Sequence, residues 1–150
     1  MAAMKSMIQI LLDVSPSMQT DHKLEMSKAF IGHYIMQRII ASKTVEFGLM
    51  TYGDDTTHNY LNSTQGGYEH VNEIIGMGKP NDQTLCAIPK VHPGRRAGDL
   101  LDGLIAAQDV LIRVNGGKAY NRILLLITDG ESKVEGKQAA LFEKCLGLDT

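Results

Sequence analysis

One stretch decides the fold of this chain: Met7-Ile-Gln-Ile-Leu-Leu-Asp-Val-Ser-Pro-Ser-Met18. Its apolar run from Ile8 to Leu12 is typical of a strand buried on both faces of a parallel sheet. The run stops at an acid, Asp13, and two hydroxyls follow at alternate positions, Ser15 and Ser17. Open α/β sheets bind their ligands at the carboxyl ends of the strands, so these oxygens mark a candidate site.

A second apolar strand ends in the same way far along the chain. It reads Arg122-Ile-Leu-Leu-Leu-Ile-Thr-Asp129-Gly130, and its segment from Ile123 to Thr128 is the most apolar predicted strand. Hard cations such as Mg²⁺ prefer oxygen ligands in near-octahedral geometry. The two strand ends together therefore offer a candidate magnesium site made of Asp13, Ser15, Ser17 and Asp129.

The remaining elements alternate between helical and extended patterns. We expect a helix that is capped by Thr20 or Asp21 and runs to about Ala41, and a turn-rich segment at Asn62–Gly67. The other predicted elements are a strand at Val45–Tyr52, a short edge strand at His70–Ile75, an irregular or partly helical crossover at Gly76–Pro93, and helices at Ala97–Val114 and Val134–Leu146.

This order predicts an α/β fold: a Rossmann-like, doubly wound, mostly parallel sheet with helices on both faces. Residues 1–150 are expected to form a single domain. Because the chain stops after a predicted helix, where folds of this class usually place another strand, we expect the domain to be truncated at its C-terminal end.

The composition limits the classes of function. A net charge of -2 gives no support for an electrostatic grip on nucleic acid by this segment. The two cysteines, Cys86 and Cys145, lack metal-ligand spacing. No apolar stretch approaches the roughly 20 residues of a membrane span, and the N-terminus lacks the shape of a signal peptide. We therefore expect a soluble intracellular protein without a membrane partner.

The sequence also argues against an enzyme. Haloacid-dehalogenase phosphatases carry a second acid two residues after the nucleophilic aspartate, but here that position is Ser15. Gly130-Glu-Ser132 lacks the glycine that would complete a nucleophile elbow, and no nucleotide-binding loop is present.

The acid-terminated strands resemble the metal-ion-dependent adhesion site of von Willebrand factor A domains, with Asp-x-Ser-x-Ser early and Asp-Gly at a later strand end. In that family a third loop supplies a threonine. The matching loop here, His92–Asp99, has none. Asp99 offers a substitute, but Arg95 and Arg96 place positive charge near a cation. The alternative interpretation, which the missing threonine and the two arginines favour, is that the site has lost its metal. Ser15 and Ser17 then cap the following helix, and Asp13 bonds to loop amides. If the metal is retained, the chain is instead expected to be a metal-dependent von Willebrand A binding domain of another complex.

Within this class, the chain most resembles the N-terminal domain of the larger (beta) subunit of the Ku heterodimer. The opening segment Leu12–Met18 resembles that of fungal members. The segment Phe47–Asn59, followed by Gly66–Val71, is similar to the family's second strand, its loop and its tyrosine-bearing third strand. Pro93–Val110 is similar to its central helix, and Ile127–Asp129 to its later strand.

The resemblance implies a nuclear, non-catalytic interaction domain of a protein that serves non-homologous end joining and telomere maintenance. It implies a heterodimer with the Ku alpha subunit, and loading onto double-strand DNA ends through a β-barrel region that this chain lacks. It also implies a groove for peptide motifs of repair or telomeric proteins, which by position involves Leu61, Tyr68 and Ile105. An acid that some members place on the later strand corresponds here to the apolar Leu125.

Overall fold

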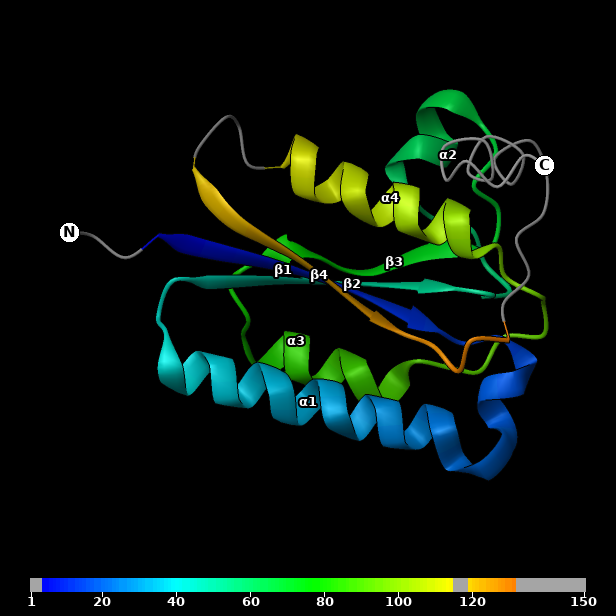
Figure 1. The fold of residues 1–150 in the computed structure, drawn as a ribbon, viewed down its shortest axis with the longest axis horizontal. Coiled ribbons are helices and arrows are strands. Elements are labelled where there is room, and N and C mark those ends of the chain that lie inside the picture. Colours follow the sequence, from blue (N-terminus) through cyan, green and yellow to red (C-terminus); the bar gives the residue numbers. More distant parts are fainter. Residues whose placement is uncertain (1–3, 115–118, 132–150) are drawn as a thin grey trace, which may run out of the picture.

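The computed structural model describes residues 4–114 and 119–131, which form one sheet between two layers of helices (Figure 1). The strand order is β3-β2-β1-β4. The central strand β1 (Lys5–Asp13) lies parallel to β2 (Val45–Tyr52) and to β4 (Tyr120–Ile127), while β3 (Val71–Gly78) runs antiparallel to β2 at the sheet edge. The predicted mostly parallel, doubly wound sheet is confirmed.

The helices cover both faces of this sheet. Figure 1 shows α1 (Lys23–Ala41) and α3 (Asp82–Ala87) on one face, and α2 (Tyr60–Gln65) and α4 (Leu100–Arg113) on the other. Two short 3₁₀ helices, η1 (Pro16–His22) and η2 (Ile88–Lys90), complete the described elements. None of the described helices is long and apolar enough to cross a membrane.

Strand β1 is buried on both faces because each face of the sheet has its own apolar cluster. Ile8, Ile10 and Leu12 belong to the cluster under α1, whereas Leu11 belongs to the cluster under α4. This alternation is the period-two geometry of a strand. The register pairs Asp13 with Tyr52 on β2 and Leu12 with Ile127 on β4, so the three parallel strands end at the same edge.

The predicted start of the first helix is wrong. Residues Pro16–His22 form the 3₁₀ helix η1, and α1 begins only at Lys23. Thr20 does not cap α1, because its hydroxyl donates to the carbonyl oxygen of Ser17 at 2.8 Å. Asp21 does not cap it either, since Asp21 and His22 both adopt positive φ, at 53° and 56°. The chain therefore turns once more before α1 starts.

The predicted turn at Asn62–Gly67 is in fact largely the helix α2, which begins at Tyr60. The side chain of Asn59 accepts a hydrogen bond from the backbone N–H of Asn62 at 2.8 Å, which is the bond of an N-cap. The crossover at Gly76–Pro93 is partly helical, as predicted, although β3 extends to Gly78. The helix predicted at Val134–Leu146 lies outside the described residues.

Helix α1 leaves part of its apolar surface out of the core. The core contacts come from Leu24, Ile31 and Ile35, whereas Met26 and Phe30 remain 66% and 50% exposed. Both exposed side chains line an open groove of about 560 Å³ between α1 and the last described strand, β4.

Candidate functional site

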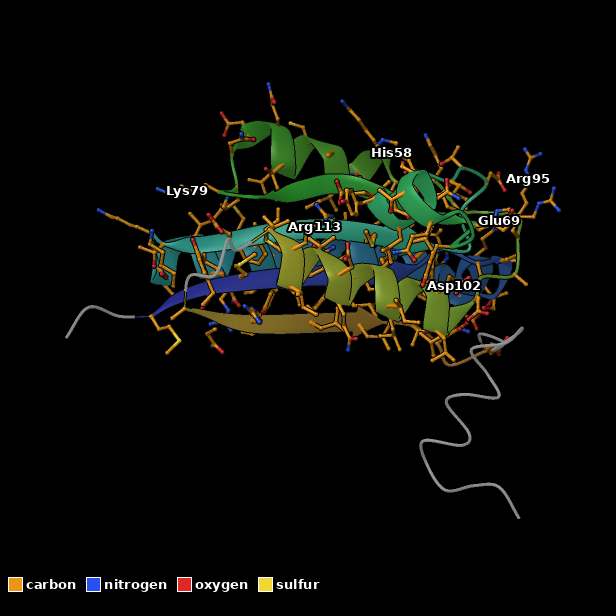
Figure 2. All side chains as sticks on the ribbon, turned by 90° about the horizontal axis from the view of Figure 1, so that it is seen from above. His58, Glu69, Lys79, Arg95, Asp102 and Arg113 are labelled. Carbon is orange, nitrogen blue, oxygen red and sulfur yellow. The ribbon has the colours of Figure 1, made fainter. Side chains whose placement is uncertain are left out.

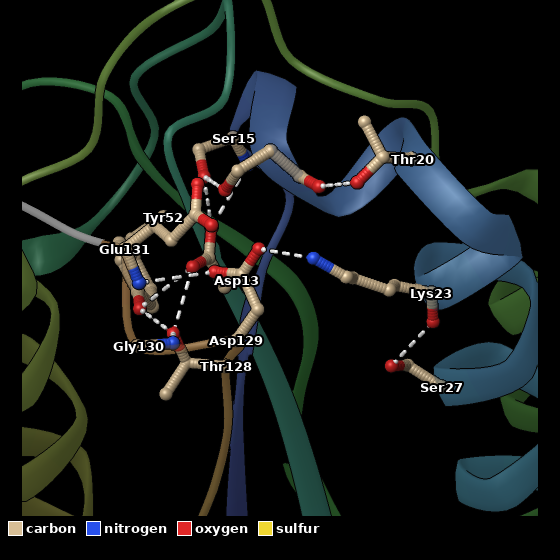
Figure 3. Close-up of polar contacts among 11 residues, drawn as sticks. Asp13, Ser15, Thr20, Lys23, Ser27, Tyr52, Thr128, Asp129, Gly130 and Glu131 are labelled. Atoms are coloured by element: carbon tan, nitrogen blue, oxygen red, sulfur yellow. Dashed lines mark hydrogen bonds and ion pairs between the residues drawn. The ribbon is translucent and has the colours of Figure 1, made fainter.

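Asp13 lies at the centre of the predicted site and is fully buried. Its Oδ1 accepts hydrogen bonds from the backbone N–H of Ser15 at 2.9 Å and from the Ser15 hydroxyl at 2.6 Å. Its Oδ2 accepts from the Tyr52 hydroxyl at 3.1 Å and from the Thr128 hydroxyl at 2.8 Å (Figure 3). A carboxylate offers about four lone-pair positions, so protein donors already fill those of Asp13.

Asp129 follows β4 at the same edge, and its side chain is only 7% exposed. Its Oδ2 accepts a hydrogen bond from the ammonium of Lys23 at 3.2 Å, and its Oδ1 accepts one from the backbone N–H of Glu131 at 3.2 Å. Burial raises the pKa of this carboxyl. The hydrogen bonds from Glu131, Ser17 and Lys23 and the positive charge of Lys23 outweigh burial and lower the pKa below its ordinary value of 3.8.

The structure therefore brings together all four residues predicted to bind a metal, but in an arrangement that does not fit Mg²⁺. Mg²⁺ needs free oxygen ligands. The acceptor positions of Asp13 hold four donors, and an ammonium faces the Oδ2 of Asp129. The described residues contain no cluster of three or more His, Cys, Asp or Glu side chains that could hold a metal ion.

The alternative interpretation of the two serines is correct in one part and wrong in the other. Asp13 does bond to a loop amide, that of Ser15. Neither hydroxyl caps a helix: no side chain caps η1 or α1. The Ser15 hydroxyl donates to Asp13 instead and lies 3.3 Å from the Ser17 hydroxyl.

The third loop, from His92 to Asp99, is fixed against this edge without supplying a metal ligand of its own. The Gly94 N–H donates to the carbonyl oxygen of Val14 at 2.7 Å. A Cβ at Gly94 would overlap the carbonyl oxygen of Gly53, so the two turns pack at backbone contact. Asp99 is used as the N-cap of α4, where its Oδ1 accepts from the N–H groups of Leu101 and Asp102.

The two arginines of this loop were expected to place positive charge near a cation, and both are exposed. The backbone N–H of Arg95 donates to Oδ1 of Asp55 at 2.9 Å, and its guanidinium lies 3.9 Å from the same carboxylate. The Arg95 side chain is 88% exposed and extends away from the sheet (Figure 2). Its charge is thus directed to solvent and to Asp55. The cation that does reach the site is Lys23, which the sequence pattern had not indicated.

The three predicted peptide-groove residues share the α4 face of the sheet. Leu61 on α2 is a buried member of the apolar cluster there, and Tyr68 and Ile105 pack against it half-buried. Asn59 holds the loop in place, because its amide donates to the carbonyl oxygens of Tyr68 at 3.1 Å and Val71 at 2.9 Å. The structure thus brings the three residues onto one surface, while peptide binding there stays a prediction.

Leu125, the position at which the resemblance led us to look for an acid, lies on the opposite face of the sheet. It packs in the cluster under α1. The acids beside the predicted groove are instead Glu69, which follows Tyr68, and Asp102 on the first turn of α4 (Figure 2). Sequence reasoning missed both, although a first-turn acid in a predicted helix is visible in the sequence.

Asp102 is an unusual carboxylate. Its Oδ1 is buried and has no hydrogen-bond partner among the described residues. Burial raises the pKa of the Asp102 carboxyl above 3.8, and the negative charges of Asp99 and Glu69 raise it further. An unpaired buried carboxylate oxygen is unfavourable in isolation, so the surroundings of Asp102 disfavour its charged form unless a cation or a hydrogen-bond donor reaches it.

A cation–π contact lies on the α4 face, at the C-terminal end of α4. The Arg113 guanidinium lies 3.9 Å from the centroid of the Tyr60 ring and also donates to Asp109 at 3.1 Å. This contact joins the end of α4 to the start of α2.

The family model of the von Willebrand factor type A domain matches residues 8–131. The chain belongs to this family. The match runs from Ile8 on the central strand to Glu131, so the acid-terminated ends of both strands lie within it.

Two curated relatives show which von Willebrand A proteins this chain resembles. This von Willebrand A domain is 25% identical over 147 residues to the X-ray repair cross-complementing protein 5 of Dictyostelium discoideum, which covers 92% of this chain. It is 28% identical over 131 residues to the ATP-dependent DNA helicase 2 subunit KU80 of Oryza sativa subsp. japonica, which covers 87% of this chain. The resemblance to the Ku beta subunit is thereby confirmed. The chain spans only 18% and 19% of the lengths of these relatives.

Solved structures agree on the fold. The SpRpn10 VWA domain superposes with a TM-score of 0.63 at 16% identity, covering 94% of this chain and 67% of that one. The pilus adhesin SpaC of Lactobacillus rhamnosus GG, in its open conformation, gives a TM-score of 0.65 at 17% identity, covering 88% of this chain and 15% of that one. At such identities the likeness concerns the von Willebrand A fold alone.

Proposed function

We propose that this chain is a non-catalytic interaction domain of a Ku-type protein that acts in DNA double-strand-break repair by non-homologous end joining and in telomere maintenance. The similarity to X-ray repair cross-complementing protein 5 and KU80 over most of the chain supports this proposal. We propose the repair role of those proteins for this chain and not the helicase activity in the name of one of them, because the sequence contains no nucleotide-binding loop.

The proposal places the protein in the nucleus, as part of a heterodimer with a Ku alpha subunit. Contact with double-strand DNA ends is assigned to the β-barrel region of the parent protein. The near-neutral net charge of -2 supports this division, because phosphate backbones are bound mainly by clusters of Lys and Arg. No membrane takes part in the proposed function.

Within that role, the α4 face is proposed to receive a short peptide from a repair or telomeric partner. The observation that carries this proposal is Oδ1 of Asp102, which has no hydrogen-bond partner among the described residues. Asp102 lies three positions before Ile105 on α4 and is close enough to Glu69, the residue after Tyr68, to sense its charge. An apolar side chain of the peptide would pack on Tyr68 and Ile105 over the buried Leu61. A Lys or Arg of the same peptide would pair with Asp102, and Glu69 would add to the negative potential.

Isothermal titration calorimetry of the purified chain tests this proposal. The ligands are short peptides that combine one aromatic or aliphatic anchor with basic residues, and matched peptides in which the basic residues are replaced by Gln. We expect the basic peptides to bind and the Gln peptides to bind about tenfold more weakly. A blunt DNA duplex titrated in parallel is expected to bind weakly or not at all.

Ile105→Ser is the test variant, and Ile112→Ser is its matched control, because both are isoleucines of α4 and Ile112 is 66% exposed. The first change is expected to abolish peptide binding and the second to leave it unchanged, with the fold of each checked by circular dichroism. Strong, salt-dependent binding of the duplex without any binding of the peptides would contradict the proposed function.

A further inference from the structure

We propose that Lys23 acts as a built-in cation at the carboxyl edge of the sheet, where its ammonium takes the place of a divalent metal ion. The inference stands apart from the proposed function, because it concerns the carboxyl edge of the sheet rather than the α4 face, and it rests on the internal bonds of the strand ends alone.

The first observation is the contact itself. Lys23 Nζ lies 3.2 Å from Oδ2 of Asp129, and the two side chains are 33% and 7% exposed. The carboxylate is thus nearly out of solvent and needs a positive partner. The ammonium is a compact point charge that comes with its own hydrogen-bond donors. It neutralises Asp129 without recruiting an ion from solution.

The second observation is how the backbone delivers this lysine. Between Asp13 and α1 the chain makes the 3₁₀ helix η1 and then places Asp21 and His22 at positive φ. Positive φ is unfavourable for residues other than glycine. This extra turn makes Lys23 the first residue of α1 and sets its side chain across the end of β4, as Figure 3 shows.

The third observation is that the ligands a metal would need are already engaged. Oδ1 and Oδ2 of Asp13 hold donors from Ser15, Tyr52 and Thr128. The Ser15 hydroxyl is turned toward Asp13. With the Lys23 ammonium on Asp129, each carboxylate of the edge is satisfied by groups of the chain. The edge is therefore complete without Mg²⁺.

The inference requires that Lys23 and Mg²⁺ compete for the same oxygens. Removal of the ammonium leaves Asp129 with the Ser17 hydroxyl and its neighbours free to bind a small hard cation. Lys23→Met retains the length of the side chain without its charge, and Lys23→Gln also retains a hydrogen-bond donor. Lys28→Met is the matched control, because Lys28 lies on the same helix but bonds to Glu25 and to the carbonyl oxygen of Val91.

The experiment measures thermal unfolding of the purified chain in MgCl₂ and in NaCl of equal ionic strength. The melting temperature of the wild type and of Lys28→Met is expected to be the same in both salts. Lys23→Met and Lys23→Gln are expected to melt lower than wild type in NaCl and to gain about 2–4 °C in MgCl₂. Adding Asp129→Asn to Lys23→Met is expected to abolish this gain.

Isothermal titration of MgCl₂ provides a second readout that does not depend on melting. Heat of binding is expected for Lys23→Gln and none for the wild type. Two results would overturn the inference. One is stabilisation or titration of the wild type by Mg²⁺; the other is a folded Lys23→Gln variant that neither binds Mg²⁺ nor is stabilised by it.

Discussion

The carboxyl edge of the sheet and the α4 face place carboxylates with buried oxygens in opposite circumstances. At the edge, Asp13 accepts four hydrogen bonds and Asp129 pairs with Lys23. On the α4 face, one oxygen of Asp102 has no hydrogen-bond partner in the part of the chain that the structure describes. The pKa of Asp129 is lowered and that of Asp102 is raised. The difference teaches that donors of the chain satisfy both carboxylates at the edge, whereas a carboxylate on the α4 face has an oxygen for which the described residues supply no donor.

The largest expected loss of stability follows from removing the carboxylate of Asp13, which lies at the centre of the carboxyl edge. Asp13→Ala leaves the hydroxyls of Ser15, Tyr52 and Thr128 without their acceptor. We expect the free energy of unfolding to fall by about 3–5 kcal/mol. Urea denaturation measures this loss, and Asp55→Ala, which removes an exposed acid, is expected to change stability by less than about 1 kcal/mol. Similar losses for the two variants would contradict this description of the edge.

A smaller loss is expected when only one donor is removed. The Tyr52 hydroxyl donates to Asp13 at 3.1 Å and lies 3.0 Å from the Thr128 hydroxyl. Tyr52→Phe retains the ring in the apolar cluster and removes this bond to a charged acceptor. We expect a loss of about 1.5–3 kcal/mol in urea denaturation. A Tyr52→Phe variant as stable as wild type would show that the Asp13 cluster does not act as a unit.

Asp129 at the edge and Asp102 on the α4 face are expected to change the stability in opposite directions as the pH rises. Since the folded pKa of Asp129 is below 3.8, its contribution is present above that pH and is lost as pH falls through the folded value. Asp129→Asn is therefore expected to be about 1 kcal/mol less stable than wild type near pH 7. The difference should shrink in acid. Denaturation from about pH 3 to pH 7 tests this, and a difference independent of pH would argue against the ionic role of Asp129.

The smallest expected effect has the opposite sign. The folded pKa of Asp102 is raised, so this group stabilises the fold fully only below 3.8, and that contribution is lost as pH rises through the folded value. Asp102→Asn is expected to gain about 0.5 kcal/mol near neutral pH and to lose this advantage in acid. The same variant should bind basic peptides more weakly. A more stable variant with undiminished peptide binding would separate Asp102 from the groove.

Much of the fold was accessible from the sequence because it follows from local patterns. The apolar run that ends at Asp13 and the one that ends before Asp129 predicted two parallel strands with a common edge, and the register confirms it. The helix over Leu100–Arg113 was predicted from its apolar spacing. The predicted start at Ala97 is three residues too early, because Asp99 is the N-cap and its side chain accepts from the first N–H groups of the helix.

The chemistry of the candidate site was less accessible, because its partners are distant in sequence. Lys23 and Asp129 are separated by 106 residues, and Asp13 and Thr128 by 115. No local pattern indicates that a lysine beyond a 3₁₀ turn reaches the second strand end. The serines, in contrast, were visible, but their spacing alone did not distinguish ligands of a metal from donors to Asp13.

The long separation of the bonds at the carboxyl edge has a consequence for the order in which the chain folds. Bonds between residues more than a hundred positions apart need long loops to close first, so we expect them to form after the local helices and the pairing of β1 with β2. The bonds of Thr128 and Lys23 should thus be absent from the folding transition state. Weakening them is then expected to accelerate unfolding while leaving the refolding rate almost unchanged, because these bonds fix the carboxyl end of β4, whose pairing with β1 also joins residues far apart in sequence.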